Sequence, residues 1–370
     1  MYTGALLGHP LAQQCTRFVT RHKPLTHRQW LRRIEQVPEV DLEVDCYGDG
    51  PAMQLLERTM ADLLGKEQAL FVHKGSVGQY AALLEYARRS RRQHIAIHPQ
   101  SHFAVDEADA YQALLRLQAV AFGSENEAIR DEDITRLAPH ADQLSTVCIE
   151  LPVRRAGFRL PDWQTLLALQ AFAQEAQVPL HIDGARLLES AHYWHKPYDQ
   201  VADLGDSVYV SLYKMLGAAA GGVIAADAEF ISSLRVWRSR LAGDLYTAFP
   251  YVLSALWGLK NYLPRVGEFH ARAQRLSECF AQRFGDAAIA HPVQSSGFQL
   301  TLPIAPQALH TLTLQVAQAQ KTWLFDRVYA NGQGRSMVEI QVGDALDDWQ
   351  DDELVDFLFD VIDARSQSPP

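Results

Sequence analysis

A lysine, an aspartate and an arginine lie after short apolar runs, at spacings that could bring them into one site. Asp183 follows the run 178–182, and Arg186 comes three residues later. Lys214 follows the alternating stretch 207–213, 31 positions after Asp183, which leaves room for one helix and one strand. If these runs are neighbouring strands, the side chains share one edge of a sheet, where open α/β sheets keep their ligand sites.

These residue types suit chemistry on an amino acid. A lysine amine can form a Schiff base with a carbonyl group. A carboxylate can hold a pyridine nitrogen protonated, and that positive charge makes the ring an electron sink. An arginine can bind a carboxylate bidentately. Backbone amides and a hydroxyl at the start of a predicted helix, here Gly75, Ser76 and Val77, can bind a phosphate. These are the parts that a pyridoxal phosphate (PLP) enzyme needs.

The chain around these residues alternates strand-like runs with amphipathic helical patterns. Helices are predicted over 52–64, around 80–87 and over 163–177, and strands over 69–72, 94–98, 146–151, 178–182, 207–212 and 222–226. This alternation predicts an α/β fold with a mainly parallel sheet covered on both faces. Beyond about residue 265, helices over 268–284 and 351–364 flank short strands at 298–302, 323–325 and 338–342. We therefore predict an N-terminal segment (1–45), a large domain (46–265) and a small C-terminal α+β domain (266–370).

Composition excludes several classes of protein. Of the 370 residues, 48% are hydrophobic and 21% charged, with a formal net charge of −10, which is typical of a globular protein and disfavours non-specific nucleic-acid binding. We see no apolar run long enough to span a membrane and no signal-peptide pattern at the start. The four cysteines form no CxxC pair, which favours a reducing compartment. We expect a cytoplasmic protein that binds neither nucleic acid nor membranes.

Three histidines recur every four residues, a spacing that could bind a metal if the stretch were helical. They are His94, His98 and His102. Pro99 interrupts the stretch, and the residues before it alternate as in a strand, so a single helical face is not expected. We therefore predict no metal site.

Five segments, in order, resemble one enzyme family. The strings HIDGARL (181–187) and SVYVSLYKMLGAAAGGVIA (207–225) are similar to those of the low-specificity threonine aldolases and β-eliminating lyases. Upstream, Cys46 to Asp49, the stretch 63–72 and the Gly75 to Gly78 turn match in the same order. The resemblance covers residues 43–260. It implies fold type I of the PLP enzymes, with a seven-stranded, mainly parallel sheet and a smaller C-terminal domain.

The resemblance also implies roles toward the cofactor. Lys214 would hold PLP and later move a proton at Cα of the substrate, and Asp183 would pair with the pyridine nitrogen. The amides of Gly75 and Val77, with the hydroxyl of Ser76, would hold the phosphate. His102 stands where a histidine stacks on the pyridine ring in this family.

Further roles concern the substrate and the assembly. Arg186 would bind the substrate carboxylate, with Arg335 or Arg327 as a second arginine from the C-terminal domain. His140, ten residues before Glu150, resembles a second active-site histidine, so His102 and His140 are the candidate bases. A homodimer or homotetramer is implied, with Tyr47 of one subunit reaching the cofactor of its neighbour.

The reaction that the resemblance implies is aldol cleavage of a β-hydroxy-α-amino acid, such as threonine or allo-threonine, to glycine and an aldehyde. The chain departs from the family around the substrate. It has Glu150-Leu151-Pro152 in place of Glu-Asn-Thr, Tyr213 and Met215 beside the lysine in place of serine and glycine, and no serine-aspartate segment in its first 45 residues. Two alternatives therefore stay open: a β-eliminating lyase that releases pyruvate and ammonia, and a catalytically silent binding protein with this fold.

Overall fold

The computed structural model describes residues 2–332 and 334–366. The chain divides into two compact units, one formed by residues 27–266 and the other by residues 1–26 with 267–370. The predicted N-terminal segment, 1–45, is thus shared, because its first 26 residues fold with the C-terminal part and the rest with the larger unit. Among the described residues, no helix combines the length and the apolar character that crossing a membrane requires.

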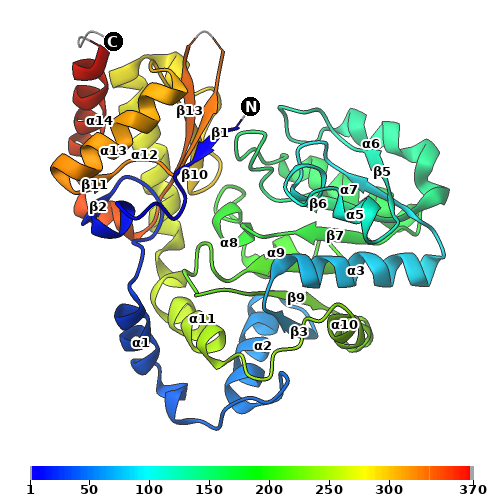
Figure 1. The fold of residues 1–370 in the computed structure, drawn as a ribbon. Coiled ribbons are helices and arrows are strands. Elements are labelled where there is room, and N and C mark those ends of the chain that lie inside the picture. The colour runs from blue at the N-terminus through cyan, green and yellow to red at the C-terminus, as the bar shows by residue number, and fades with distance from the viewer. Residues whose placement is uncertain (1, 333, 367–370) are drawn as a thin grey trace. The chain divides into compact units, whose positions relative to one another are not determined.

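A seven-stranded sheet forms the centre of the larger unit (Figure 1). Its strands, in spatial order, are β3 (Gln68–Val72), β9 (Gly222–Ala226), β8 (Ser207–Ser211), β7 (Leu180–Asp183), β6 (Leu144–Glu150), β4 (His94–Ile97) and β5 (Gln118–Ala121). Strand β9 is antiparallel to both of its neighbours, and the remaining neighbouring pairs are parallel. The α/β class and the mainly parallel sheet predicted from the sequence are confirmed.

The central strands are buried along their whole length, so both of their faces lie in the interior of the unit. In β8, Val208 and Val210 pack into one hydrophobic cluster while Tyr209 packs into another. Successive side chains of a strand point to opposite faces, so the two clusters lie on the two sides of the sheet. Helices therefore cover both of its faces.

The longer helices of this unit are α1 (His27–Glu35), α2 (Pro51–Leu63), α3 (Gly75–Ser90), α7 (Trp163–Glu175), α10 (Ala228–Arg240) and α11 (Phe249–Asn261). The shorter ones are α4 (His102–Val105), α5 (Ala110–Ala113), α6 (Asp131–Leu137), α8 (Leu187–Ser190) and α9 (Tyr198–Ala202). Residues of α3 and α10 share a cluster with Tyr209, whereas residues of α2, α7 and α11 share the other cluster. Helix α3 starts in the predicted phosphate-binding turn.

Glu85 anchors α3 through a buried carboxylate. Its side chain is 1% exposed, and it accepts hydrogen bonds from Arg88, from Arg89 and from the indole of Trp237 at 2.7–3.0 Å. Burial alone would raise the pKa of Glu85, but these three donors outweigh burial and lower it to about 2. The carboxylate therefore stays ionised through the physiological range.

We predict that Glu85→Gln lowers the free energy of unfolding by about 1–3 kcal/mol at neutral pH, since the charged acceptor is lost. Because the folded-state pKa is depressed, this stabilisation is fully present above about pH 4.5 and disappears as the pH falls toward 2. Urea unfolding of both proteins along that pH range measures the difference. Glu229→Gln removes an 84% exposed partner of Arg89 and should cost less than about 0.5 kcal/mol. Equal losses in the two variants would contradict this account.

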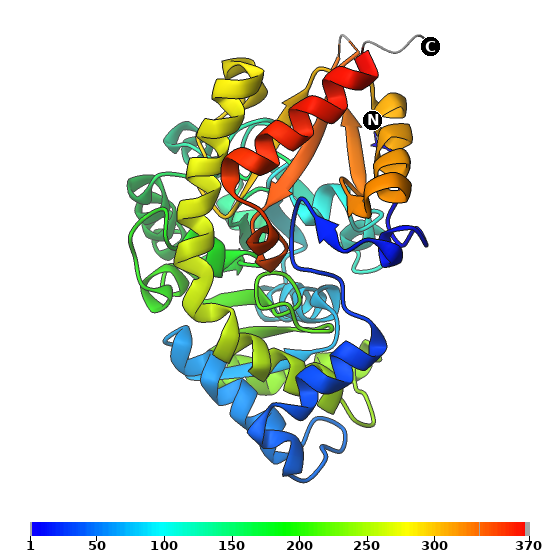
Figure 2. The ribbon, with the colours of Figure 1, turned by 90° about the vertical axis from the view of Figure 1, so that its left-hand side faces the viewer.

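The smaller unit contains a four-stranded antiparallel sheet in the order β1 (Tyr2–Ala5), β12 (Arg327–Ala330), β13 (Ser336–Gln341) and β10 (Gly297–Leu302). Strands β2 (Arg17–Phe18) and β11 (Thr322–Trp323) form a short parallel pair. Its helices are α12 (Val266–Phe284), α13 (Pro306–Gln320) and α14 (Asp351–Ser366). Helices α12 and α14 lie side by side (Figure 2), joined by an ion pair between Arg283 and Asp356 and by contact of Phe284 with Phe359.

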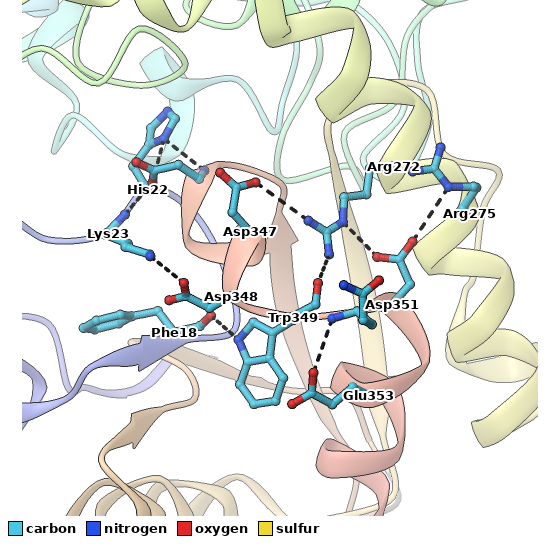
Figure 3. A network of polar contacts seen from close by, with 12 residues as sticks. Phe18, His22, Lys23, Arg272, Arg275, Asp347, Asp348, Trp349, Asp351 and Glu353 are labelled. Carbon is cyan, nitrogen blue, oxygen red and sulfur yellow. Dashed lines mark hydrogen bonds and ion pairs between the residues drawn. The ribbon is translucent and has the colours of Figure 1, made fainter.

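Polar contacts bind the first residues of the chain to this smaller unit (Figure 3). Lys23 forms an ion pair with Asp348 at 2.7 Å, and the indole of Trp349 donates to the carbonyl of Phe18 at 2.9 Å. Arg272 of α12 donates to the carbonyl of Trp349 at 2.6 Å. One network thus joins the N-terminal segment, α12 and the start of α14, which explains why residues 1–26 fold with the C-terminal part of the chain.

Candidate functional site

The carboxyl ends of neighbouring strands carry the charged residues of the candidate site. In the register of the sheet, Asp183 at the end of β7 is paired with Glu150 at the end of β6 and with Tyr209 of β8. Lys214 lies three residues after the end of β8, and Arg186 lies between β7 and α8. Since β6, β7 and β8 are parallel, these residues emerge at the same, carboxyl edge of the sheet.

The surroundings of Lys214 lower the pKa of its amine, which favours the neutral, nucleophilic form. Burial lowers its pKa most, and the positive charge of Arg186 lowers it further, whereas Asp183 and Glu150 oppose the shift. The net result is a pKa of about 7. A substantial share of the amine is therefore neutral at physiological pH, as attack on a carbonyl group requires.

This pKa predicts how attachment of PLP to the cofactor-free protein depends on pH. The rate should rise about tenfold between pH 6 and 8 and then level off, because the amine is then almost fully neutral. A lysine with an ordinary pKa would instead give a rate that keeps rising about tenfold per pH unit up to about pH 10. Stopped-flow absorbance after mixing with PLP measures the rate. A curve without a plateau below pH 9 would contradict the lowered pKa.

The carboxylate of Asp183 is buried and held by two donors. Its Oδ1 accepts from the amide of Ala185 at 3.1 Å, and its Oδ2 accepts from the side-chain amide of Gln79 at 2.7 Å. Both of its oxygens are therefore fixed in direction by a donor. Asp183 is thus an oriented negative charge with lone pairs left for a cationic partner.

The start of α3 provides a place for an anion. The helix has 16 residues, and Lys74 at its N-cap makes no side-chain capping hydrogen bond. Amides in the first turn of a helix have no carbonyl partner within it and carry the positive end of its dipole. The amide of Val77 instead donates to the carbonyl of Lys74 at 3.1 Å. The amides of Gly75 and Ser76, with the Ser76 hydroxyl, are therefore better placed than Val77 to bind a phosphate.

Gly75 is required by close packing. A Cβ atom at this position would lie 2.3 Å from the hydroxyl oxygen of Tyr209 and 2.7 Å from Cζ of the same ring. The Tyr209 ring lies in the core and its hydroxyl reaches the turn, so the turn can approach the sheet only without a side chain.

We predict that Gly75→Ala weakens PLP binding at least tenfold, because the first turn of α3 must move away from Tyr209. Fluorescence titration with PLP measures the affinity, and far-UV circular dichroism reports whether the fold is kept. The double variant Gly75→Ala, Tyr209→Phe lacks the nearest clashing atom and should recover part of the affinity. Unchanged binding by Gly75→Ala would remove this turn from the proposed site.

His102 is held from two sides. Its amide donates to Oε2 of Glu150 at 2.7 Å, and its Nδ1 lies 2.6 Å from Oε1 of Glu107. The ring itself is 42% exposed, whereas the Glu107 side chain is buried. Burial alone would lower the pKa of His102, but the hydrogen bond that its ring donates to Glu107 and the charge of Asp183 raise it overall. The ring is thus fixed in orientation and able to hold a proton.

Glu150 fixes the backbone at His102 through hydrogen bonds to its carboxylate. It accepts amide hydrogen bonds from His102 and, at 3.3 Å, from Arg154. Burial and the nearby negative charge of Asp183 raise its pKa to about 7, although the two amides oppose the shift. Glu150 therefore fixes the backbone that carries His102.

Arg186 has an unsatisfied donor at the same edge. Its Nε is buried and has no hydrogen-bond partner among the described residues, and its Cζ lies 5.5 Å from the ring centroid of Phe158. Buried polar groups are almost always paired in a working protein. An external carboxylate fits this donor, because guanidinium groups bind carboxylates in a planar, bidentate way.

Three predicted residues are not brought to this edge within the larger unit. His140 is exposed in a 3-10 helix, Ala138–Gln143, which precedes β6. The seven residues of β6 extend about 20 Å, so within this unit His140 lies at the opposite edge of the sheet from Glu150, and its role as a second active-site histidine stays a prediction. Arg327 and Arg335 belong to the smaller unit, and their role as a second carboxylate ligand stays a prediction.

Sequence reasoning missed Gln79 and Glu107, which touch Asp183 and His102. Gln79 comes one helical turn after Gly75, so helical spacing alone could have placed it near the same end of α3. Glu107 follows a predicted active-site histidine by five residues, a weaker signal. Among the residues that the structure describes, no group of three or more His, Cys, Asp or Glu side chains is arranged to bind a metal.

Comparison with known proteins agrees with this geometry. The sequence profile of a family described as β-eliminating lyase matches residues 33–298. Low-specificity L-threonine aldolase 1 of Arabidopsis thaliana is 27% identical over 258 residues, which are 68% of this chain and 72% of that protein. Crystal structures of a putative L-allo-threonine aldolase from Listeria monocytogenes and of a putative aromatic amino acid β-eliminating lyase/threonine aldolase from Exiguobacterium each superpose with a TM-score of 0.86. They are 26% and 27% identical, and each comparison covers 96% of this chain and 98% of the other.

Proposed function

Because the chain belongs to the β-eliminating lyase family, we propose that it is a PLP-dependent lyase that cleaves a β-hydroxy-α-amino acid, of the threonine or allo-threonine type, to glycine and an aldehyde. The observation that carries the proposal is the placement of Lys214, Asp183 and Arg186 at the ends of adjoining strands of one sheet. The relatives named as threonine aldolases support this choice of reaction.

The residues at the sheet edge fit PLP. Lys214 offers an amine with a pKa of about 7, and Asp183 offers a buried, oriented negative charge for the pyridine nitrogen. The first amides of α3, with Ser76, would hold the phosphate, and His102 would cover the ring. When bound, PLP supplies an electron sink that accepts the electron pair of the breaking Cα–Cβ bond.

The protein's own groups bind and orient the substrate and move its protons. Arg186 binds the substrate carboxylate through its unsatisfied buried Nε–H. Glu107 engages Nδ1 of His102, which leaves Nε2 to take the proton of the β-hydroxyl group as the aldehyde leaves. The amine of Lys214, once released, moves a proton at Cα of the glycine product. Each of these roles is a proposal that rests on the geometry described above.

The decisive experiment combines cofactor mapping with a product assay. The protein is purified with PLP, reduced with borohydride, and the modified peptide is identified by mass spectrometry. The unreduced protein is then incubated with threonine and with allo-threonine, and glycine and acetaldehyde are measured. A pyridoxyl mass on Lys214 together with glycine supports the proposal, and a colourless protein without an adduct would overturn it.

The same product assay distinguishes aldol cleavage from the alternative reaction, β-elimination. The chain departs from the family pattern at Leu151-Pro152, next to Glu150. Because this change would alter the residues around the substrate, β-elimination is the alternative reaction. Pyruvate and ammonia formed from serine, with no glycine from threonine, would establish β-elimination instead.

We also propose that the protein is a homodimer or homotetramer. Large apolar side chains of the larger unit are exposed, among them Leu31, Val44, Tyr47 and Tyr246 at 62–70%. The rings of Tyr47 and Tyr246 contact each other edge to face, with centroids 5.5 Å apart, and together form an exposed aromatic pair. A second copy of the chain would cover such a surface. Light scattering after size-exclusion chromatography tests this, and a monomer at micromolar concentration would contradict it.

A further inference from the structure

A row of polar side chains crosses the core behind Asp183. Gln79 donates to Oδ2 of Asp183 at 2.7 Å, and its amide oxygen lies 2.9 Å from Nε2 of His181. Nδ1 of His181 lies 2.7 Å from the hydroxyl of Ser207, which accepts from the hydroxyl of Tyr86 at 2.7 Å. All five residues are at most 4% exposed. The row joins α3, β7 and β8, and the chemistry proposed above does not use its four outer members.

The ionised carboxylate fixes the direction of every hydrogen bond in this row. Asp183 can only accept, so the NH₂ group of Gln79 must face it and the amide oxygen must face His181. His181 must then carry its proton on Nε2 and accept at Nδ1 from Ser207. Ser207, whose hydroxyl donates a hydrogen bond to His181, accepts one from the hydroxyl of Tyr86.

His181 serves in this row as a neutral ring, because a second ring proton, on Nδ1, would make Ser207 accept from both His181 and Tyr86 and would leave the hydroxyl proton of Ser207 without an acceptor in the row. Burial provides that state. It lowers the pKa of His181 to about 4, although the negative charge of Asp183 opposes the shift. The ring therefore stays neutral at physiological pH, as the direction of the hydrogen bonds requires.

The row ends inside the protein. Tyr86 is 4% exposed, and its ring packs against Phe230 with centroids 4.6 Å apart. A path that ends against an aromatic side chain in the core does not deliver protons to solvent. Its effect is to set the position and the charge state of the group at its other end.

We infer that Gln79, His181, Ser207 and Tyr86 are positioning residues that hold Asp183 as an oriented, ionised acceptor for the pyridinium nitrogen. The inference rests on the proposed function, because it takes Asp183 to be the partner of that nitrogen. Donation by Gln79 stabilises the negative charge on Asp183. The proton shared between the carboxylate and the cofactor therefore stays on the ring nitrogen.

The first test reads that proton directly. PLP labelled with ¹⁵N in the ring is bound to the wild type, to Gln79→Leu and to His181→Leu, and the ¹⁵N chemical shift reports whether the nitrogen is protonated. We expect a protonated nitrogen in the wild type, and in Gln79→Leu a shift toward the unprotonated value with PLP binding at least tenfold weaker. His181→Leu should show a smaller change in the same direction, because Gln79 loses its orienting partner.

Two further variants separate positioning from stability. His181→Gln keeps a donor that can face Gln79 and should restore the wild-type ¹⁵N shift and an affinity within about threefold of the wild type. Leu83→Val removes one methylene from a fully buried position of α3 that packs in a different cluster. It should lower stability without moving the ¹⁵N shift. A wild-type ¹⁵N shift in Gln79→Leu, or the same change in Leu83→Val, would overturn the inference.

The second test does not need the cofactor. In protein labelled with ¹⁵N-histidine, the His181 signals are identified by their absence in His181→Gln, and their shifts report the tautomer. We expect a neutral ring protonated on Nε2. A charged ring, or a proton on Nδ1, would refute the proposed direction of the row. If the wild type bound no PLP, the proposed function would fail, while this measurement would still decide whether the row is ordered as inferred.

Discussion

Lys214→Ala is expected to abolish covalent attachment of PLP and to lower kcat for glycine formation by about 10³-fold or more. The amine of Lys214 combines a strand-end position with a pKa lowered to about 7. An alanine offers no nucleophile for the cofactor and no group to move a proton at Cα. Removal of a group that acts in the chemical step lowers kcat and kcat/KM together. Borohydride mapping and single-turnover kinetics measure both effects.

Lys66 provides a matched control for this variant. Burial lowers the pKa of Lys66 as well, and its Nζ donates to the carbonyl of Gly205 at 2.7 Å. It precedes β3, at the opposite edge of the sheet from Lys214. Lys66→Ala should therefore lose some stability but keep the pyridoxyl mass on Lys214 and a kcat near that of the wild type. An adduct that persists in Lys214→Ala would show that another lysine holds the cofactor.

The sequence predicted the groups that stand at strand ends and failed where long-range packing decides. Asp183 and Lys214 follow apolar runs directly, so the strand pattern alone placed them at one edge of the sheet. His140 was proposed only from a family resemblance, and no strand pattern places it at that edge, because the strand β6 separates it from Glu150. The folding of residues 1–26 with the C-terminal unit depends on contacts such as Lys23 with Asp348, which no local pattern reveals.

The residues that contact Asp183 and its neighbours also could not be identified from local sequence patterns. Gln79 and His181 are unremarkable in the sequence, one within a helix and one within a strand. The structure joins them because α3 packs on the sheet and places the side chain of Gln79 between Asp183 and His181 of β7. A buried polar residue in an apolar strand, such as His181, is the one local sign, since such a group must find hydrogen-bond partners in the core.

Asp183→Asn is expected to leave PLP attached to Lys214 but to lower kcat by about 10³-fold. The substitution keeps the shape of the side chain and removes its charge, so the pyridine nitrogen loses the anion that keeps it protonated. The geometry adds a second cost. Asp183 accepts from Gln79 with one oxygen and from the amide of Ala185 with the other. Asparagine has a single oxygen, so one of these buried donors is left unpaired or faces another donor.

Borohydride mapping, kcat and the ¹⁵N shift of the bound pyridine nitrogen separate these effects. Asp133→Asn is the control, because Asp133 is also buried and accepts an amide hydrogen bond, from Arg130 at 2.9 Å, at the start of α6. It should cost about 1 kcal/mol of stability and leave kcat unchanged. If Asp183→Asn kept kcat within tenfold of the wild type, the electron sink would not depend on this carboxylate. The hydrogen-bonded side chains behind Asp183 would then not contribute to catalysis.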